Sequence, residues 1–469
     1  MFKALQKPRV VYLGLSLELY LTSMPSYMER WGKVFDCWRQ QLSQLAEIVY
    51  SRTCYTESDM AEAVAGFANL APDAIVMSPL SYTASLTSVP FIQDCGIPII
   101  LWSTQFADRI KEDYRPEDLS MNHTVQGTQD ITNVLFQRGV DFAVVTGHYQ
   151  DEVSNARLAD CLIAARAARL AWKIRTVSLG GMFKGMGDFE FDAAQATRQW
   201  GPEFFSATID EFREEFMSAD DRELEELRQQ DLKSYEIAPE LSQETHLNSL
   251  RGYLALRGLL KKYQADALTM NFLNLMKEPK CPVLPFFGIN RLMAEGMGYA
   301  GEGDALRAAL MAHLRQLAGM ANFTEIYTVD FKRDIMLMSH MQECNPAFAR
   351  RDRKIKLLHK KFRAPGVAPY CGMYFTLEPG ETTLVTLTCD GKGGFRYIAF
   401  AGIIEDAELF PNYDRPYWLL RSQNNVSELL DRYSLTGGTH HLIALPGNQL
   451  AKLKQLAYWQ KFEFYDITE

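Results

Sequence analysis

Four residues in the last third of the chain could together bind a metal ion and move protons: Glu302, Glu325, His340 and His441. Two carboxylates and two imidazoles, without a thiolate, favour Mn²⁺, Mg²⁺ or Fe²⁺ over structural zinc. Because the four lie far apart in the sequence, only the fold can bring them together. If it does, the two carboxylates can transfer protons beside the ion, which is the equipment for enediol chemistry on a sugar.

The two glutamates also allow structural explanations. Glu302 lies in a Gly-Glu-Gly-Asp turn before a predicted helix, where a carboxylate can cap the helix and complement its dipole. Asp304 fits the cap better, which leaves Glu302 for another role. Glu325 lies in a run of strand-forming residues, 322–327, and a buried carboxylate there needs a metal ion or a salt bridge as its partner. Taken alone, each glutamate is more often structural than functional.

The histidines are ambiguous in the same way. His340 follows the apolar run 335–338, and a lone histidine on an apolar face is more often a core residue than a ligand. His440 and His441 follow a Gly-Gly turn, and neighbouring strand residues face opposite sides. Only one of this pair can therefore point at a given site. The prediction of a metal site depends on the four residues jointly.

The composition excludes several functional classes. The chain has 469 residues, enough for two to four domains, with 47% hydrophobic and 23% charged residues, as in a soluble globular protein. Its net charge of −9 offers no basic surface for nucleic acid. The most basic stretch, 350–363, is interleaved with apolar residues, and we interpret it as a solvated face beside a strand.

The cysteines and the N-terminus bear on the cellular compartment. Eight cysteines occur singly, without a CxxC pair, which favours reduced thiols over a disulfide framework or a structural zinc site. They are Cys37, Cys54, Cys95, Cys161, Cys281, Cys344, Cys371 and Cys389. We find no cleavable signal pattern and no run of about 18 apolar residues. We therefore expect a soluble cytoplasmic protein that does not bind membranes.

The first 178 residues alternate short apolar runs with amphipathic stretches. The runs are rich in Val, Ile and Leu and are bounded by turn residues, as buried strands are. They cover residues 10–15, 74–77, 98–102, 142–146 and 174–178. Strands that alternate with helices predict a parallel, doubly wound sheet. Ligands of such sheets bind at the carboxyl ends of strands, so 16–18, 103–105 and 147–148 are candidate pocket linings.

In the rest of the chain the sequence pattern changes near residue 322, from alternating strands and helices to mostly strands. Residues 179–321 continue the α/β pattern, beginning with a glycine-rich stretch that does not fit GxGxxG, so we expect no dinucleotide site. After it come period-2 or β-branched runs separated by glycine turns, typical of meander or barrel strands. They cover 372–376, 382–389 and 395–404. The predicted fold is α/β: two doubly wound α/β domains, 1–178 and 179–321, followed by a β-rich, barrel-like domain, 322–469.

Four phrases surround the candidate ligands. They are Asn-Arg-Leu-Met-Ala-Glu-Gly-Met-Gly-Tyr-Ala-Gly-Glu-Gly-Asp (290–304), Phe-Thr-Glu-Ile-Tyr-Thr-Val-Asp-Phe (323–331), Ser-His-Met-Gln-Glu-Cys-Asn-Pro (339–346) and Gly-Gly-Thr-His-His (437–441). In order and spacing they resemble the L-arabinose isomerases, and two segments of the first domain, 103–106 and 144–151, are more weakly similar to that family. The resemblance implies the architecture shared by L-fucose and L-arabinose isomerases.

The resemblance also implies a role for each of the four residues. Glu302, Glu325, His340 and His441 match the family's four metal ligands, which usually bind Mn²⁺, with Mg²⁺, Co²⁺ or Fe²⁺ as other divalent candidates. Glu302 and Glu325 match its acid/base pair. In that chemistry the ion chelates two oxygens of an open-chain aldose, one glutamate removes the C2 proton, and the other delivers a proton to the neighbouring carbon through a cis-enediol. No organic cofactor is required.

The predicted substrate shell departs from the family pattern. An Asn-Gln-x-Ala-His-Gly phrase of the family is here Asn-His-Thr-Val-Gln-Gly, in which His123 and Gln126 have exchanged places. Leu17 stands where the family has a sugar-contacting glutamine, and Glu18 follows it in place of a histidine. Phe183 aligns with a pocket methionine of the family. A site built to hydrogen-bond one pattern of hydroxyls rejects others, so we expect a substrate other than L-arabinose.

Phe272 and His440 are also expected to bind the substrate, and we expect the protein to form an oligomer. Phe272 keeps the aromatic wall of the family pocket, and we place His440 among the substrate-binding residues. In family oligomers a neighbouring subunit contributes to the sugar site, so we expect a homo-oligomer (trimer, tetramer or hexamer) with its site at an interface. Two alternatives stay open: a sugar C2 epimerase on the same site, and a non-catalytic sugar-binding protein. Survival of both glutamates argues against the second.

Overall fold

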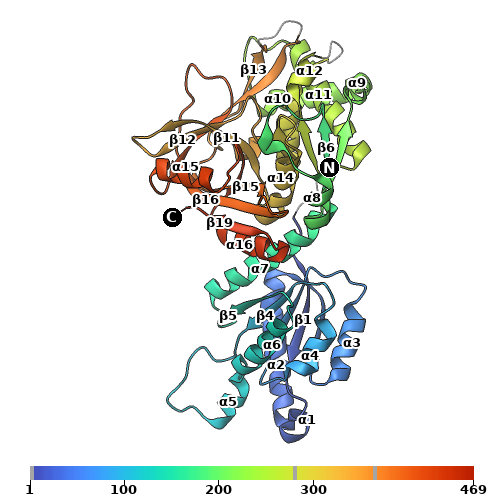
Figure 1. Cartoon of the computed structure of the whole chain (residues 1–469), viewed down its shortest axis with the longest axis vertical. Coiled ribbons are helices and arrows are strands. Elements are labelled where there is room, and N and C mark those ends of the chain that lie inside the picture. The colour runs from blue at the N-terminus through green and yellow to red at the C-terminus, as the bar shows by residue number, and fades with distance from the viewer. Residues whose placement is uncertain (1–4, 278–281, 363–366, 469) are drawn as a thin grey trace. The chain divides into compact units, whose positions relative to one another are not determined.

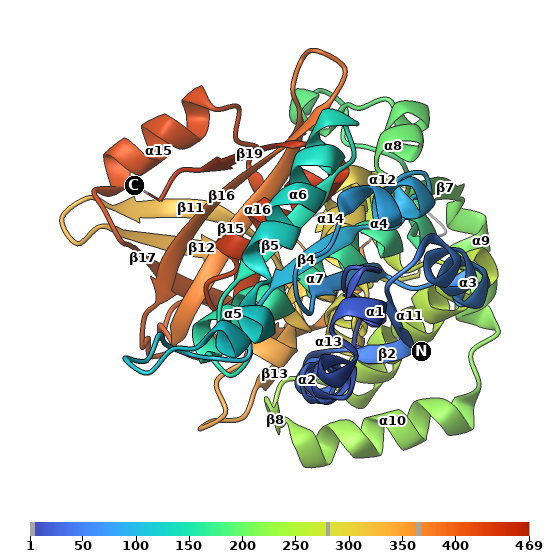
Figure 2. The same cartoon turned by 90° about the horizontal axis from the view of Figure 1, so that it is seen from below.

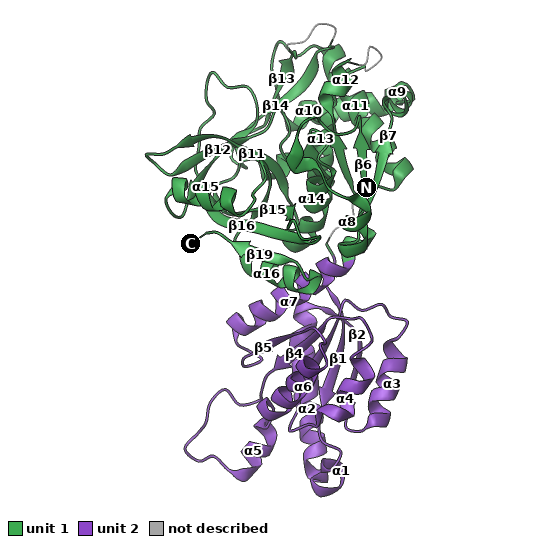
Figure 3. Ribbon diagram, in the orientation of Figure 1, with its two compact units in different colours: residues 1–5, 170–469 green, residues 6–169 purple. Residues whose placement is uncertain are grey.

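The computed structural model describes residues 5–277, 282–362 and 367–468. The chain forms two compact units, an N-terminal unit of residues 6–169 and a larger unit of residues 1–5 and 170–469 (Figure 3). Of the residues discussed above, Cys281 and Arg363 lie outside the described ranges.

The N-terminal unit is a parallel sheet with strand order β2-β1-β3-β4-β5 and with helices on both faces (Figures 1 and 2). Its strands are β1 (Arg9–Leu15), β2 (Glu47–Cys54), β3 (Ala74–Pro79), β4 (Ile99–Ser103) and β5 (Phe142–Thr146). Its helices are α1 (Tyr20–Ser23), α2 (Pro25–Leu45), α3 (Glu57–Phe67), α4 (Ser85–Ile92), α5 (Pro116–Asn122), α6 (Val125–Gln137) and α7 (Glu152–Leu170). The expected doubly wound sheet is confirmed, although the sequence analysis did not identify β2.

Alternate residues of β1 explain why helices cover both faces of this sheet. Val11 and Leu13 lie on one face, in a core that includes Met60 of α3. Tyr12 points to the other face, where its ring stacks on Phe35 of α2 at a centroid distance of 4.9 Å. Since both faces of the sheet are apolar, helices must cover both of them. The ends of the strands are then the part of the sheet that a ligand can reach.

The larger unit begins with a second parallel sheet, of order β10-β9-β6-β7. Its strands are β6 (Arg175–Leu179), β7 (Glu203–Ala207), β9 (Ala267–Met270) and β10 (Gly298–Gly301). Its helices are α8 (Ala193–Gln199), α9 (Ile209–Met217), α10 (Asp221–Ser234), α11 (Gln243–Tyr263), α12 (Phe272–Lys277), α13 (Phe286–Glu295) and α14 (Ala305–Ala318). The sequence analysis assigned strand 174–178 to the first sheet, and this was wrong: the strand pairs with β7 and β9, because an apolar run does not reveal its partners.

The β-rich segment forms a closed barrel. Its strands follow the order β15-β18-β11-β12-β17-β16-β19, and the additional pairing of β15 with β16 closes the ring, with β19 attached to β16. They are β11 (Asn322–Asp330), β12 (Ile335–Ser339), β15 (Gly380–Cys389), β16 (Phe395–Ile404), β17 (Tyr417–Ser422), β18 (His441–Pro446) and β19 (Glu463–Asp466). Helices α15 (Val426–Leu435) and α16 (Leu450–Gln460) and a small sheet of β8 (Glu236–Ile237), β13 (Lys356–Lys360) and β14 (Tyr370–Tyr374) complete the unit. The barrel-like expectation is confirmed, whereas the three-domain division at 178 and 321 stays a prediction.

Three simpler expectations concern the surface and the thiols. Within the described ranges, no helix is both long and apolar enough to cross a membrane. The seven described cysteines are all free thiols. In the basic stretch, Arg350 pairs with Asp352, and Arg353 pairs with Glu408, whose side chain is 82% exposed. The stretch is thus a solvated face that leads into β13, as the sequence indicated.

Candidate functional site

The fold brings Glu302, Glu325, His440 and His441 into one cluster. Each offers a ligand atom, and these atoms lie within 4.8 Å of one another. Glu302 follows β10 of the second parallel sheet, Glu325 lies in β11, and His441 is the first residue of β18. Barrel pairing places Glu325 directly opposite His441, so the register of two strands fixes this part of the site.

His340 borders the same cluster from the end of β12. Its Nε2 lies 3.8 Å from Oε1 of Glu325, and its ring centroid is 5.6 Å from that of His441. The structure therefore brings together all four residues expected to bind a metal, and it adds His440, whose Nε2 lies 3.6 Å from the same Glu325 oxygen. Which imidazoles bind an ion stays a prediction.

Each of the three imidazoles is held by its own carboxylate. In every case a carboxylate oxygen contacts Nδ1, and Nε2 is left facing Glu325. The Nδ1 contacts are His340 with Glu343 (2.7 Å), His440 with Asp188 (2.7 Å) and His441 with Asp304 (2.9 Å). This carboxylate–histidine arrangement orients metal-binding imidazoles in many proteins and fixes which nitrogen is available.

The buried pair of His340 and Glu343 is poised to carry charge. Burial disfavours both charged forms, but the Glu343 carboxylate raises the pKa of His340. In turn, His340 and hydrogen bonds from the backbone and Tyr299 lower the pKa of Glu343 against its burial. The pKa of Glu325 is also lowered despite burial, because His441, His340 and His440 surround it. A cluster of ionised carboxylates facing imidazole nitrogens is what a divalent cation would neutralise.

In the partly exposed pair of Asp188 and His440, each residue also shifts the pKa of the other, and these shifts are larger. Burial opposes the charge on His440, but its hydrogen bond with Asp188 and the nearby carboxylates of Glu302 and Glu325 raise its pKa to about 10. Burial likewise opposes the charge on Asp188, yet its contacts with His440 lower its pKa to about 2. Both residues are thus charged around neutral pH in the absence of an ion.

The turn that carries Glu302 has an unusual backbone. Glu302 itself has φ +64°, a left-handed conformation that is uncommon outside glycine, and Gly303 has φ +91°. Asp304 accepts a hydrogen bond from the backbone N–H of Arg307 and so caps α14, as the sequence predicted. The carbonyl of Glu302 accepts a hydrogen bond from the N–H of Phe183 at 2.9 Å. The loop after β6 therefore holds the turn in place.

Residues 181–189, which we call the β6 loop, contain the expected residue Phe183, but Asp188 and Phe189 of the same loop were not predicted as site residues. Phe189 is 1% exposed, and its ring stacks on His441 at 4.8 Å and lies 5.0 Å from His440. Asp188 contacts His440, as described above. The sequence signal for Asp188 and Phe189 is the density of glycines in this stretch, which is typical of a backbone that packs closely against another segment.

Replacing Gly303 with alanine is expected to displace the β6 loop. A Cβ at this position would lie 2.3 Å from the carbonyl oxygen of Gly181 and 2.4 Å from Cα of Met182, so backbone must move. We expect a lower unfolding temperature and weaker Mn²⁺ binding, measured by calorimetry. Gly181→Ala is the matched control, because Gly181 also has positive φ (+73°) but nothing lies within 4 Å of the added Cβ. Equal effects of the two variants would show that backbone strain alone, and not the close packing, matters.

The residues fit a divalent metal ion. Nε2 of His441 is buried and has no hydrogen-bond partner, although Oε1 of Glu325 lies 3.2 Å away. An orphaned nitrogen in a fully buried side chain is costly unless it has a ligand. Together with the carboxylates of Glu302 and Glu325 it provides the oxygen and nitrogen donors that Mn²⁺ and related ions accept.

Two aromatic residues expected at the sugar site lie close to the cluster. Phe183 and Phe272 are 7% and 4% exposed, and their rings meet edge to face at 5.1 Å. Phe272 also packs on Phe286 at 5.8 Å. Since the backbone N–H of Phe183 is hydrogen-bonded to the carbonyl of Glu302, this aromatic pair lies next to the turn that carries the candidate acid/base residue.

The remaining expected sugar contacts belong to the N-terminal unit. Leu17 and Glu18 follow β1 after one intervening residue, Ser16, at the carboxyl ends of the strands. His123 precedes α6 and stacks on Tyr82 at 5.5 Å, and Gln126 is an exposed residue of α6. Their role as substrate contacts stays a prediction.

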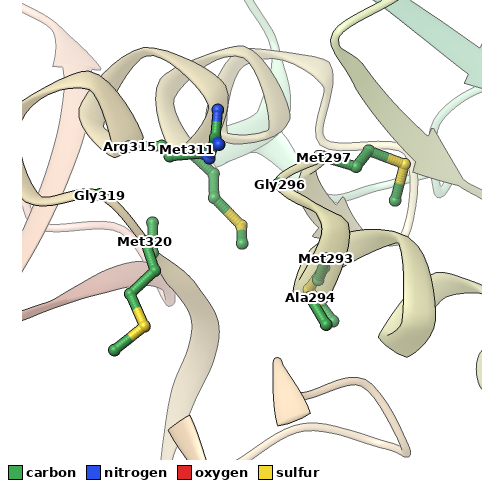
Figure 4. A pocket seen from close by; sticks show the side chains of 9 residues that line it. Met293, Ala294, Gly296, Met297, Met311, Arg315, Gly319 and Met320 are labelled. Atoms are coloured by element: carbon green, nitrogen blue, oxygen red, sulfur yellow. The ribbon is translucent and has the colours of Figure 1, made fainter. Parts of the chain in front are cut away.

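A small cavity elsewhere in the larger unit is not part of the site. It measures about 50 Å³ and is lined by Met293, Met297, Met311, Met320 and Arg315, among others (Figure 4). None of the clustered glutamates or histidines lines it. It has room for one or two waters and is too small for a sugar.

Residues 175–320 match the model of the L-arabinose isomerase central domain, and residues 320–463 match that of the L-arabinose isomerase C-terminal domain. The chain belongs to the L-arabinose isomerase family. The matched regions carry every glutamate and histidine of the cluster, and members of this family are aldose–ketose isomerases.

Similar members of the family come from Yersinia and Serratia species. L-arabinose isomerase of Yersinia enterocolitica is 23% identical over 379 residues, covering 78% of this chain and 75% of the relative. The enzyme of Serratia proteamaculans is 23% identical over 390 residues, covering 79% and 76%. Among solved structures, a periplasmic solute-binding protein from Actinobacillus succinogenes with bound D-allose covers 66% of this chain and 92% of its own, at 15% identity and a TM-score of 0.15. That likeness is too slight to bear on the fold.

Proposed function

We propose that this member of the family is a metal-dependent aldose–ketose isomerase. The observation that carries the proposal is the convergence of Glu302 and Glu325 with three imidazoles whose Nε2 atoms all face Glu325, at 3.2 to 3.8 Å from its Oε1. A protein that only binds sugar needs no such pair of carboxylates. Glu302, Glu325, His340 and His441 are the proposed ligands of Mn²⁺ or another divalent ion, consistent with the donor set.

The metal ion and the two glutamates have different roles in the proposed reaction. When bound, the ion would polarise the sugar carbonyl and acidify the proton on C2. Of Glu302 and Glu325, one accepts the C2 proton and the other delivers a proton to C1. Because O2 loses its proton and O1 gains one in the same conversion, the carbonyl moves from C1 to C2. Positioned acid–base groups of this kind contribute about 10²–10⁴-fold each. The wall of Phe183 and Phe272 excludes water on one side of the reacting carbons.

The proposed substrate is an aldose other than L-arabinose. The support is the rewritten set of expected sugar contacts: Leu17, Glu18, His123, Gln126 and Phe183 all differ from the family pattern. When a site loses a residue that hydrogen-bonds a substrate hydroxyl, its selectivity between sugars changes by orders of magnitude.

Metal removal and a sugar panel test the proposal together. After treatment with EDTA, the protein is expected to lose conversion of aldoses to ketoses, and added Mn²⁺ is expected to restore it. The measurement is chromatographic analysis of a panel of aldopentoses, aldohexoses and their 6-anionic derivatives. Products formed in D₂O separate the alternatives, because an isomerase yields a deuterated ketose and a C2 epimerase a deuterated aldose. Metal binding without conversion of any sugar would favour a non-catalytic binding protein.

The proposed assembly is a homo-oligomer, such as a trimer, tetramer or hexamer, with a sugar site that includes two subunits. Support comes from the N-terminal unit, where the segment that leads to His123 exposes Phe106, Ile110 and Leu119 by 50%, 84% and 51%. Apolar side chains this exposed are typical of an interface. Light scattering of the purified protein tests it. The free thiols also suit a reducing compartment such as the cytoplasm.

A further inference from the structure

Asp188 and His440 form the least buried of the three carboxylate–histidine pairs. Oδ2 of Asp188 accepts hydrogen bonds from Nδ1 of His440 at 2.7 Å and from its backbone N–H at 3.2 Å. The side chains are 38% exposed for His440 and 32% for Asp188, whereas those of the other two pairs are at most 1% exposed. This pair therefore lies on the side of the cluster that solvent reaches, where a substrate would enter.

A second set of contacts fixes Asp188 to the buried core of the site. Its carbonyl oxygen accepts a hydrogen bond from Nη2 of Arg307 at 2.5 Å. Arg307 is 1% exposed and also bonds to Oδ1 of Asp304, whose other oxygen holds His441. The next residue, Phe189, stacks on His441. Asp188 is thus held rigidly at its backbone, so its carboxylate can in turn hold His440.

The hydrogen bond to Asp188 determines where Nε2 of His440 lies. Nε2 of His440 lies 3.6 Å from Oε1 of Glu325 and 4.0 Å from Oε2 of Glu302, beyond good hydrogen-bond distance of either. It therefore borders the space between the two proposed acid/base groups. If the Nδ1 contact were lost, the ring could turn and carry Nε2 away from this space.

We propose that Asp188 is the positioning residue for His440 and keeps Nε2 of this expected substrate-binding histidine directed at the sugar. The proposal rests on the proposed function, which supplies the sugar. Asp188 acts through the imidazole and touches no substrate itself. The pair differs from those of His340 and His441, whose carboxylates are buried beneath the proposed metal ligands, because it lies at the open side of the cluster.

The competing possibility is that His440 is a metal ligand, since its nitrogen falls within the same 4.8 Å group. Affinity for Mn²⁺ separates the two roles. Loss of a partner that orients a ligating histidine typically lowers metal affinity by about 10–100-fold. If His440 contacts the sugar instead, Asp188→Ala leaves Mn²⁺ affinity unchanged, as measured by electron paramagnetic resonance of the free ion.

Kinetics of the Mn²⁺-loaded enzyme give the second readout. Asp188→Ala is expected to raise KM by about 10-fold or more, as lost orientation of a binding group does, with a smaller change in kcat. Asp188→Asn should restore most of the loss, because the amide oxygen still accepts a hydrogen bond from Nδ1–H. In combination with His440→Ala, Asp188→Ala should add nothing further; additive effects would overturn the proposal. Glu190→Ala, an exposed carboxylate two residues away, is the matched control.

A third readout does not depend on turnover. Specific ¹⁵N labelling of the eight histidines allows the ring N–H of His440 to be followed in the Mg²⁺-loaded protein. We expect a slowly exchanging Nδ1–H that disappears in Asp188→Ala and persists in Asp188→Asn. Persistence in Asp188→Ala would overturn the positioning role. If the signal behaves as expected but the wild type converts no aldose, the proposed function and the sugar contact fail, while the orientation of His440 by Asp188 stands.

Discussion

Replacing Glu325 with glutamine is expected to lower kcat by about 10³-fold, within the range that a positioned acid–base group contributes. Glutamine has nearly the same shape and can still accept hydrogen bonds, but it cannot accept a proton at neutral pH. Glu325 also faces the Nε2 atoms of all three imidazoles. The variant should therefore bind Mn²⁺ more weakly as well, and kcat is measured at saturating Mn²⁺ to separate the two effects.

The matched control is Glu381→Gln. Glu381 is an exposed glutamate of β15 in the same barrel, so it tests the chemical change without the site. Its kcat should equal that of the wild type. Turnover by Glu325→Gln at more than a tenth of the wild-type rate would contradict the assignment of Glu325 as a proton carrier.

Replacing Asp304 with asparagine is expected to destabilise the larger unit by about 3–5 kcal/mol, the usual cost of leaving one partner of a buried ion pair unpaired. Asp304 and Arg307 are 0% and 1% exposed, and their side chains are 3.3 Å apart. Asparagine can still cap α14 and contact His441, so the loss reports mainly the charge. Urea unfolding of the metal-free protein, followed by circular dichroism, measures it.

A second pair in the same chain provides the control. Asp330 and Arg333 have the same i,i+3 spacing, but their side chains are 35% and 63% exposed. Exposed ion pairs contribute little to stability, so Asp330→Asn should leave the urea midpoint almost unchanged. A similar shift of the urea midpoint in Asp304→Asn and Asp330→Asn would mean that the loss of stability does not come from leaving the buried Arg307 unpaired.

The sequence predicted the residues that cluster at the site better than the carboxylates that hold the imidazoles. Glu302, Glu325, His340 and His441 were found because each lies in a specific local phrase. Glu343 and Asp188 could not be found in this way, because their function depends on which imidazole they meet in space. Asp188 is separated from His440 by most of the larger unit's sequence, and no periodicity reports such a contact.

The same division applies to the fold. The start of α14 was predicted from its cap, Asp304, because the local sequence determines where a helix begins. The sheet membership of β6 was predicted wrongly, since pairing is a property of distant strands. The close approach of Gly303 to Gly181 was likewise invisible, because it depends on how two loops pack.

The closed barrel has a consequence for the order in which the protein folds. His441 reaches Glu325 only when β18 inserts between β15 and β11, and β18 lies far along the chain from β11. Pairings between distant segments form slowly, because the chain must first give up the entropy of a long loop. The cluster of glutamates and histidines therefore cannot form before β18 has been synthesised, and any ion that bound it would stabilise only the finished barrel.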